Sequence, residues 1–183
     1  AAVEEIRRFT AQSDCVVVVG LPESYDGRIY SVCSVIYRGE EIVPRSGERH
    51  PLRPLADAST EPSKGGLLPA SDAVLNFDDF SIRIIPGDPA DLPVIAGEEG
   101  LGADIILCPC AMPSAAGTFA RRRNGAQMAS MNYACAVATC GCGFGEATSP
   151  YIYRGFAGVC ECGQVLRFSA QSGTGPMFEV CDV

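Results

Sequence analysis

The stretch FSIRIIPGDPADLP, residues 80–93, decides the fold, because a strand there runs directly into a broken loop. Ile82 and Ile84 alternate with polar residues, which is the period of a half-buried strand. Prolines and a glycine then end the strand. In α/β proteins reactive side chains usually stand at the carboxyl end of a strand. Asp88 is therefore a well-placed carboxylate, although no partner acid or base stands near it in the sequence.

Outward from this stretch, the chain alternates between predicted strands and a few predicted helices. Helices are predicted over residues 1–12, 91–99 and 118–132, with Asp91 as the N-cap of the second. Strands are predicted over residues 14–20, 29–37, 73–77, 80–85, 103–109, 133–139, 151–160, 164–170 and 177–182. The strands over 73–77 and 80–85 are expected to pair as a hairpin. Many strands with few helices predict sheets that carry the helices on their outer faces.

Length and composition favour one domain that is neither exported nor embedded in a membrane. A chain of 183 residues can bury a real core, and no apolar run approaches the roughly 18 residues that a membrane span needs. Residues 1–12 are charged and do not resemble a signal peptide, so we expect a cytoplasmic protein. The formal net charge of −8 argues against a nucleic-acid or anionic-membrane partner. The basic run over 121–123 is expected to lie on a solvated helix face.

Histidine and lysine are scarce, which limits the available chemistry. The only histidine is His50 and the only lysine is Lys64. Both lie in the segment 44–72, which is rich in Pro, Gly and Ser, and loops of that length are usually functional or disordered. Any histidine-dependent triad must therefore use His50, and any lysine-dependent step must use Lys64.

Six of the ten cysteines form three Cys-x-Cys pairs, at 108/110, 140/142 and 160/162. Ten cysteines fall below the roughly 8–10% of a disulfide-stapled secreted chain, so we expect reduced thiols. Zinc sites prefer a spacing of two to four residues between cysteines, whereas alternate residues of a strand share one face. The pairs are therefore predicted to be small buried residues that hold no metal and form no disulfide. Metal or redox binding stays open as an alternative.

Several segments follow one another in the order of a known family. They are VVGLP (18–22), DGRIYSVCSVIYRGEEI (26–42), GADIILCPCAMPSAAG (102–117), FARRR (119–123), GFGEATSPYIYRGF (143–156) and ECGQVLRFS (161–169). In this order the chain resembles the carbon–nitrogen hydrolase, or nitrilase, superfamily. It is most similar to the glutaminase domain of glutamine-dependent NAD synthetases, in a degenerate form. The resemblance covers nearly the whole chain.

The resemblance implies an α/β fold of the α+β kind, the nitrilase-like αββα sandwich. In such a sandwich two mixed sheets lie face to face with helices outside. It implies one glutaminase-type domain over residues 1–183 that lacks the family's first strand–helix–strand segment. It also implies a homo-oligomer, with an NAD-synthetase-type domain or subunit as a further partner. No cofactor and no metal are expected.

The family's catalytic residues are not found at the positions that the resemblance assigns to them. The nucleophilic cysteine falls on Gly87, beside Asp88, and the oxyanion-stabilising lysine falls on Arg45. The general-base glutamate falls before residue 1. The two positions that bind glutamine fall on Met112 and Thr118.

Three functions remain open from the sequence. The first is a non-catalytic nitrilase-like domain with a structural or regulatory role in an NAD-synthetase-like protein. The second is an amide or glutamine hydrolase that uses non-standard residues, with Asp88 and the hydroxyls and thiols of 110–118 as candidates. The third is a thiol-based metal or redox module. Glutamine hydrolysis separates the first two, and metal content tests the third.

Overall fold

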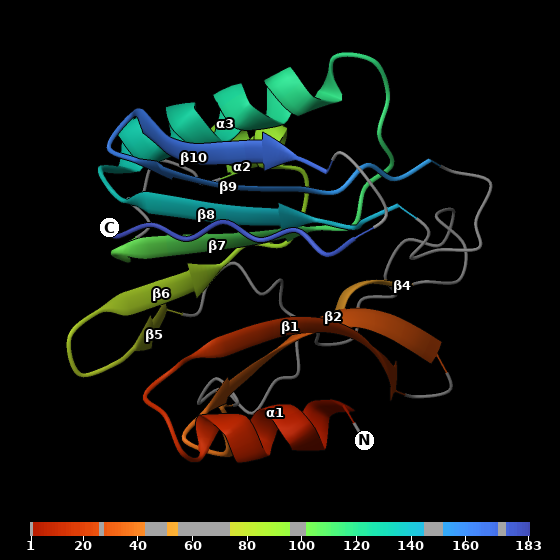
Figure 1. Cartoon of the computed structure of the whole chain (residues 1–183), viewed down its shortest axis with the longest axis vertical. Coiled ribbons are helices and arrows are strands. Elements are labelled where there is room, and N and C mark those ends of the chain that lie inside the picture. The colour runs from red at the N-terminus through yellow and green to blue at the C-terminus, as the bar shows by residue number, and fades with distance from the viewer. Residues whose placement is uncertain are drawn as a thin grey trace. The chain divides into compact units, whose positions relative to one another are not determined.

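The computed structural model describes residues 2–25, 28–42, 51–54, 74–95, 102–144, 152–171 and 175–183 (Figure 1). It divides the chain into two compact units, Ala1–Ala73 and Val74–Val183. Each unit contains one sheet and helical segments, as the predicted fold class requires. The expectation of one domain over 1–183 stays a prediction. Arg45, His50 and Lys64 lie outside the described residues.

The first unit is a small antiparallel sheet with one helix. Its elements are α1 (Ala2–Thr10), β1 (Val17–Tyr25), β2 (Arg28–Tyr37), β3 (Glu40–Ile42) and β4 (Pro51–Pro54). Strand β2 is the centre, because β1, β3 and β4 all pair with it antiparallel. Thr10 is fully buried at the end of α1, and its hydroxyl accepts a hydrogen bond from Gly39 N at 3.1 Å. This bond ties the helix to the turn between β2 and β3.

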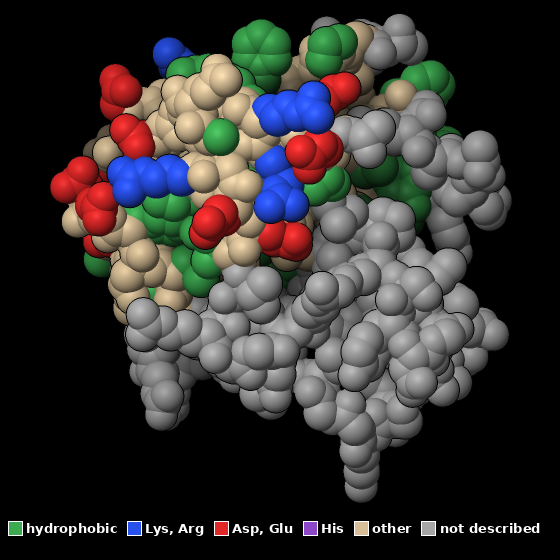
Figure 2. Space-filling view, turned by 90° about the horizontal axis from the view of Figure 1, so that it is seen from below, with side chains coloured by type: hydrophobic (Ala, Val, Ile, Leu, Met, Phe, Trp, Pro, Cys, Tyr) green, Lys and Arg blue, Asp and Glu red, His purple; other side chains and the backbone are tan. Residues whose placement is uncertain are grey.

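The outer surface beside α1 carries charges of both signs. Acidic and basic side chains are interspersed over the described part of the face in Figure 2. Among the described residues of this unit, Arg8 pairs with Glu4 at 3.7 Å and Arg38 pairs with Asp14 at 3.0 Å. Their side chains are exposed, so each pair contributes about 0–1 kcal/mol. Neither sign dominates the described surface in this view.

The second unit is a six-stranded mixed sheet in the order β10-β9-β8-β7-β6-β5. Strands β6, β7 and β8 run parallel, and the other neighbours pair antiparallel. The strands are β5 (Val74–Asn76), β6 (Ser81–Ile84), β7 (Ile105–Cys110), β8 (Ala136–Gly141), β9 (Phe156–Glu161) and β10 (Gln164–Ala170). The helical segments are the 3₁₀ turn η2 (Pro89–Asp91), α2 (Leu92–Ile95) and α3 (Thr118–Tyr133).

The core of the second unit lies between its sheet and the helices α2 and α3, which lie on one side of it (Figure 1). Its buried members are Ile85, Leu92, Ile106, Cys108, Ala126, Ala129, Cys135, Val137 and Cys160. Helix α3 presents small residues to the core, so its backbone lies close to the neighbouring elements. A Cβ added at Gly125 would lie only 2.4 Å from the carbonyl oxygen of Pro89. A glycine is therefore required where α3 crosses η2.

Most predicted elements of both units are confirmed, including the β5–β6 hairpin and the helix over 118–132. Three predictions are wrong. The helical segment after β6 begins with Asp88 as its cap, not with Asp91, because Asp88 Oδ1 accepts from Ala90 N at 3.0 Å. Residues 175–183 form neither helix nor strand, since alternation alone does not supply a neighbouring strand. Part of the predicted loop over 44–72 forms β4.

Candidate functional site

The carboxyl end of β6 continues alongside β7 after the strand itself ends. Ile85 N donates to Leu107 O at 2.8 Å, and Gly87 N donates to Pro109 O at 3.0 Å. Gly87 has φ +151°, a backbone conformation that residues with side chains rarely adopt. The space beside it is open, because an ideal Cβ would meet nothing within 4 Å. The chain conformation, not crowding, therefore favours glycine here.

Asp88 forms the buried centre of this end of the sheet. The residue is 7% exposed, and its carboxylate caps η2 through the bond from Ala90 N. Arg121 Nη2 donates to Oδ2 at 3.1 Å, and Arg122 Nε donates to Oδ1 at 3.3 Å. No partner for Asp88 is visible in the neighbouring sequence. The structure supplies two, Arg121 and Arg122 of α3.

Arg122 is buried, which contradicts the prediction of a solvated face for the basic run over 121–123. Its side chain is 2% exposed, whereas that of Arg121 is 61% exposed. The cause is helical periodicity, because Arg122 lies one turn before Ala126 on the face of α3 that packs on the sheet. A charge on that face must be paired, and Asp88 provides the pairing.

The pKa of Asp88 is lowered by its partners. Burial of the carboxylate raises the pKa, but the hydrogen bonds from Ala90 N and from the two arginines, with the charge of Arg122, outweigh it. Asp88 is therefore ionised at neutral pH and already accepts three hydrogen bonds. A general base works best with a pKa near the working pH, so this carboxylate is suited to holding structure.

The guanidinium of Arg122 also holds the loop between β7 and α3. Its Nη2 donates to Met112 O at 3.3 Å and to Pro113 O at 3.1 Å, and Nη1 donates to Ser114 Oγ at 3.5 Å. The planar group lies over the Phe156 ring, with Cζ 5.1 Å from the ring centroid. The buried Arg122 guanidinium thus joins Asp88, which follows β6, to the loop before α3 and to the start of β9.

Met112 and Thr118, the predicted glutamine-binding positions, are both engaged locally. Met112 contributes its carbonyl oxygen to Arg122, and its side chain is 39% exposed. The Thr118 hydroxyl donates to Ala115 O at 2.6 Å and accepts from Ala115 N at 3.1 Å. Arg122 therefore joins Asp88 to the backbone of Met112, while the hydroxyl of Thr118 closes the turn that leads into α3.

Comparisons with known proteins agree on the fold. No protein-family model and no curated protein matches this sequence. Among solved structures, a glutamine-dependent NAD(+) synthetase from Cytophaga hutchinsonii is 19% identical, with a TM-score of 0.61, and covers 91% of this chain. Saccharomyces cerevisiae Nit3, a member of branch 10 of the nitrilase superfamily, is 16% identical, with a TM-score of 0.68, and covers 96%. The chain has the nitrilase fold.

The similar structures are longer than this chain. The match covers 30% of the Cytophaga synthetase and 62% of Nit3. XC1258 from Xanthomonas campestris, a CN-hydrolase superfamily protein, is 16% identical with a TM-score of 0.64, over 94% of this chain and 64% of that one. Identities this low establish the nitrilase fold and no more.

The thiols nearest the β6 end of this nitrilase fold are buried. Cys108 Sγ donates to Gly87 O at 3.6 Å, and Cys110 lies two residues further along β7, 4% exposed. Burial is the largest cause that raises the pKa of both thiols. A protonated, buried thiol is a poor nucleophile. The prediction that this pair consists of small buried residues is confirmed.

The other two Cys-x-Cys pairs depart from that prediction. Cys140 and Cys162 are exposed, whereas Cys160 is buried. The two-residue alternation holds only inside a strand, and Cys162 lies in the turn after β9 has ended at Glu161. The described residues contain no group of three or more His, Cys, Asp or Glu side chains placed to hold a metal ion. Within the same ranges, no helix is long and apolar enough to cross a membrane.

Sequence reasoning missed Arg122, the residue that organises the site. Its signal was present, because the buried residues of α3 recur every three or four positions: Arg122, Gly125, Ala126, Ala129 and Ser130. An arginine in phase with small core residues predicts a buried, paired charge.

Proposed function

We propose that this chain is a non-catalytic nitrilase-fold domain, with a structural or regulatory role in a protein similar to a glutamine-dependent NAD synthetase. One observation carries the proposal. At the carboxyl end of β6, glycine stands where the resemblance puts the nucleophile, and the adjacent carboxylate of Asp88 is occupied by Arg121 and Arg122.

Amide hydrolysis needs a nucleophile, a base and oxyanion stabilisation in one place. Gly87 has no side chain to attack with. Asp88 is ionised and accepts hydrogen bonds from two arginines, so it is a poor base. Cys108 and Cys110 are buried, and their pKa values are raised. Arg122, a cation that could stabilise an oxyanion, donates instead to Asp88 and to the carbonyls of the following loop.

The link to NAD synthesis rests on similar folds. Glutamine-dependent NAD synthetases from Cytophaga hutchinsonii and Acinetobacter baumannii are 19% and 15% identical to this chain, which covers 30% and 31% of their lengths. In a protein of that kind, this domain would contribute packing surface to a synthetase-type domain or subunit. We expect a cytoplasmic homo-oligomer, and a monodisperse monomer at high micromolar concentration in light scattering would contradict that expectation.

Ammonia release from glutamine tests the central claim. The purified chain should release none above the no-enzyme blank. Cys110→Ser and Cys15→Ser are matched thiol variants, one beside the site and one on the exposed surface of the first unit. Ammonia release that persists on repurification and is lost only in Cys110→Ser, with an unchanged circular dichroism spectrum, would establish a hydrolase with a relocated nucleophile. Release lost in Asp88→Asn would assign the chemistry to that carboxylate.

A further inference from the structure

Cys135 and Cys162 face each other at the end of the β8–β9 ladder, although they are far apart in the sequence. The antiparallel register pairs Ala136 with Glu161, so the next pair outward is Cys135 with Cys162. Cys162 N donates to Cys135 O at 3.2 Å, which places the two backbones side by side. Directly opposite residues of such a ladder have Cα atoms about 4.5–5.5 Å apart, inside the range that a disulfide spans.

Cys135 and Cys162 lie directly beyond the end of the β8–β9 ladder, next to its core pair. Val137 and Cys160 are paired, and both lie in the core beneath α3. Cys135 lies just before β8 and Cys162 just after β9, where φ of Cys162 is +45°, and, after burial, the charge of Cys162 helps to raise the pKa of Cys135, so the two thiols lie within electrostatic reach of each other. The thiols differ in access, because Cys135 is 5% exposed whereas Cys162 is exposed.

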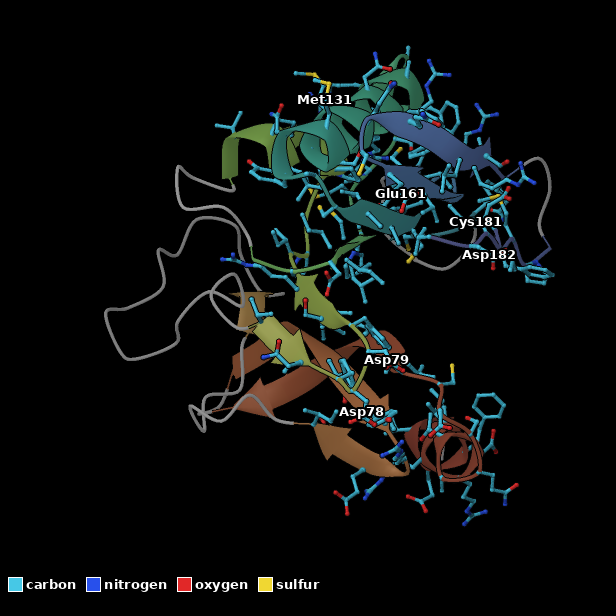
Figure 3. The ribbon with its side chains drawn as sticks, turned by 90° about the vertical axis from the view of Figure 1, so that its left-hand side faces the viewer. Asp78, Asp79, Met131, Glu161, Cys181 and Asp182 are labelled. Carbon is cyan, nitrogen blue, oxygen red and sulfur yellow. The ribbon has the colours of Figure 1, made fainter. Side chains whose placement is uncertain are left out.

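The turn that carries Cys162 is fixed against α3. Gly163 N donates to Ser130 Oγ at 3.0 Å, and Gln127 Nε2 donates to Gly163 O at 2.8 Å. A Cβ at Gly163 would lie 3.1 Å from Met131 Cβ, and Figure 3 labels Met131 on the helix and Glu161 at the end of β9. The backbone N–H and C=O of Gly163 are thus both hydrogen-bonded to side chains of α3. These bonds hold the turn that carries Cys162 beside Cys135.

We propose that Cys162 is a site of reversible oxidation by a low-molecular-weight disulfide such as glutathione disulfide, with Cys135 as its resolving partner. The Cys162 thiolate attacks one sulfur of glutathione disulfide, breaks its S–S bond and releases one glutathione thiolate. The Cys135 thiolate then attacks the Cys162 sulfur of the mixed disulfide and releases the second glutathione thiolate. Two protein thiols lose two protons and two electrons, and glutathione disulfide is reduced to two glutathiones.

The surroundings of the two thiols set the order of the steps. Burial raises the pKa of Cys135 to about 11, with further contributions from Cys162 in the turn and from Asp104 before β7. Tyr133, at the end of α3, also interacts with Cys135, whose charge contributes to raising the pKa of Tyr133 after burial. At pH 7 only a small fraction of Cys135 is thiolate, so the exposed thiol reacts first and closure follows slowly.

Peptide mapping of the oxidised full chain tests the proposal. The reduced protein is treated with glutathione disulfide, quenched with acid at intervals, alkylated and digested with trypsin, and fragment spectra assign each linkage. The expected sequence is glutathione on Cys162 and then a Cys135–Cys162 cross-link between peptides 124–154 and 155–167. Starting from the mixed disulfide isolated at low pH, closure should accelerate about tenfold per pH unit between pH 7 and pH 9.

Three variants sharpen the result. Cys135→Ala should stop at the mixed disulfide, Cys162→Ser should form neither product, and Cys15→Ser, which lacks an exposed thiol in the other unit, should behave as wild type. A mixed disulfide in the wild type that does not close at pH 9, or a cross-link from Cys162 to Cys160, would overturn the proposal. If Cys135→Ala fails to fold, the wild-type map and its pH dependence decide alone.

Discussion

The two ends of the parallel strands β6, β7 and β8 differ in what the chain places there. The carboxyl end holds Asp88 and Arg122, which are buried, charged and fully engaged with each other and with the backbone. The amino end holds an exposed pair, Asp104 and Ser81, and beside it the accessible thiol of Cys162. The buried, paired charges therefore lie at the carboxyl end and the exposed thiol at the amino end, whereas reactive groups of α/β proteins usually lie at the carboxyl end.

The two ends differ in how their polar groups are paired. The loop before α3, η2 and α3 converge at the carboxyl end of the parallel strands. Each polar group that could act on a substrate is instead paired with another group of the same chain. Substitutions at the two ends should therefore affect stability very unequally.

Arg122→Ala should have the largest effect. Removing the guanidinium leaves the Asp88 carboxylate buried with one exposed partner and removes the donors to two loop carbonyls. Breaking a buried ion pair costs about 3–5 kcal/mol, so the free energy of unfolding in urea should fall by that amount. Arg123→Ala, at an exposed position of the same helix, is the control and should change it by less than about 0.5 kcal/mol. Equal effects would show that Arg122 contributes only surface charge.

Asp88→Asn should cost less, because the amide oxygen can still cap η2. It loses the charge-assisted bonds to Arg121 and Arg122, about 1.5–3 kcal/mol of unfolding free energy at pH 7. Because the folded pKa of Asp88 is lowered, its contribution is complete above the unfolded pKa of about 4 and disappears as the pH falls through the folded pKa. Urea titrations should show a constant difference from wild type between pH 5 and pH 7 that shrinks below pH 4. A difference that grows on acidification would contradict the assignment.

Gly87→Cys should destabilise the carboxyl end without creating activity. The new side chain has room, but φ +151° is strained for any residue with a Cβ, which costs about 1–3 kcal/mol. The adjacent carboxylate of Asp88 is not free to act as a base, since it is already paired with two arginines. We expect a lower urea midpoint and no ammonia release from glutamine. The control is Gly175→Cys, an exposed position with no atoms near an added Cβ. Turnover by Gly87→Cys would show that the site needs only a sulfur.

The sequence predicts the architecture of the chain better than it predicts the site. Local periodicity predicts the β5–β6 hairpin and α3. The nitrilase fold is expected from the resemblance carried by the order of the motifs, not from periodicity. The partners of Asp88 lie more than thirty positions away, and a local pattern cannot reveal them. The Cys135–Cys162 pair is hidden for the same reason, since it depends on the β8–β9 register.

Asp104→Asn should have the smallest effect on stability. Its Oδ2 accepts from Ser81 N at 2.8 Å and from the Ser81 hydroxyl at 2.6 Å, which joins the starts of β6 and β7 in an exposed position. The Ser81 hydroxyl and then the Ser81 N–H lower the pKa of Asp104, but water competes for the same carboxylate, so the urea midpoint should shift less than in Asp88→Asn.

The Asp104→Asn substitution has a second readout, because the charge of Asp104 helps to raise the pKa of Cys135. Closure of the Cys135–Cys162 disulfide from the isolated mixed disulfide should therefore be faster in Asp104→Asn and unchanged in Asp91→Asn, an exposed carboxylate at the opposite end of the sheet. A midpoint shift as large as that of Asp88→Asn would mean that the two ends are equally important for stability. Closure that is unchanged or slower in Asp104→Asn would mean that the charge of Asp104 does not raise the pKa of the Cys135 thiol.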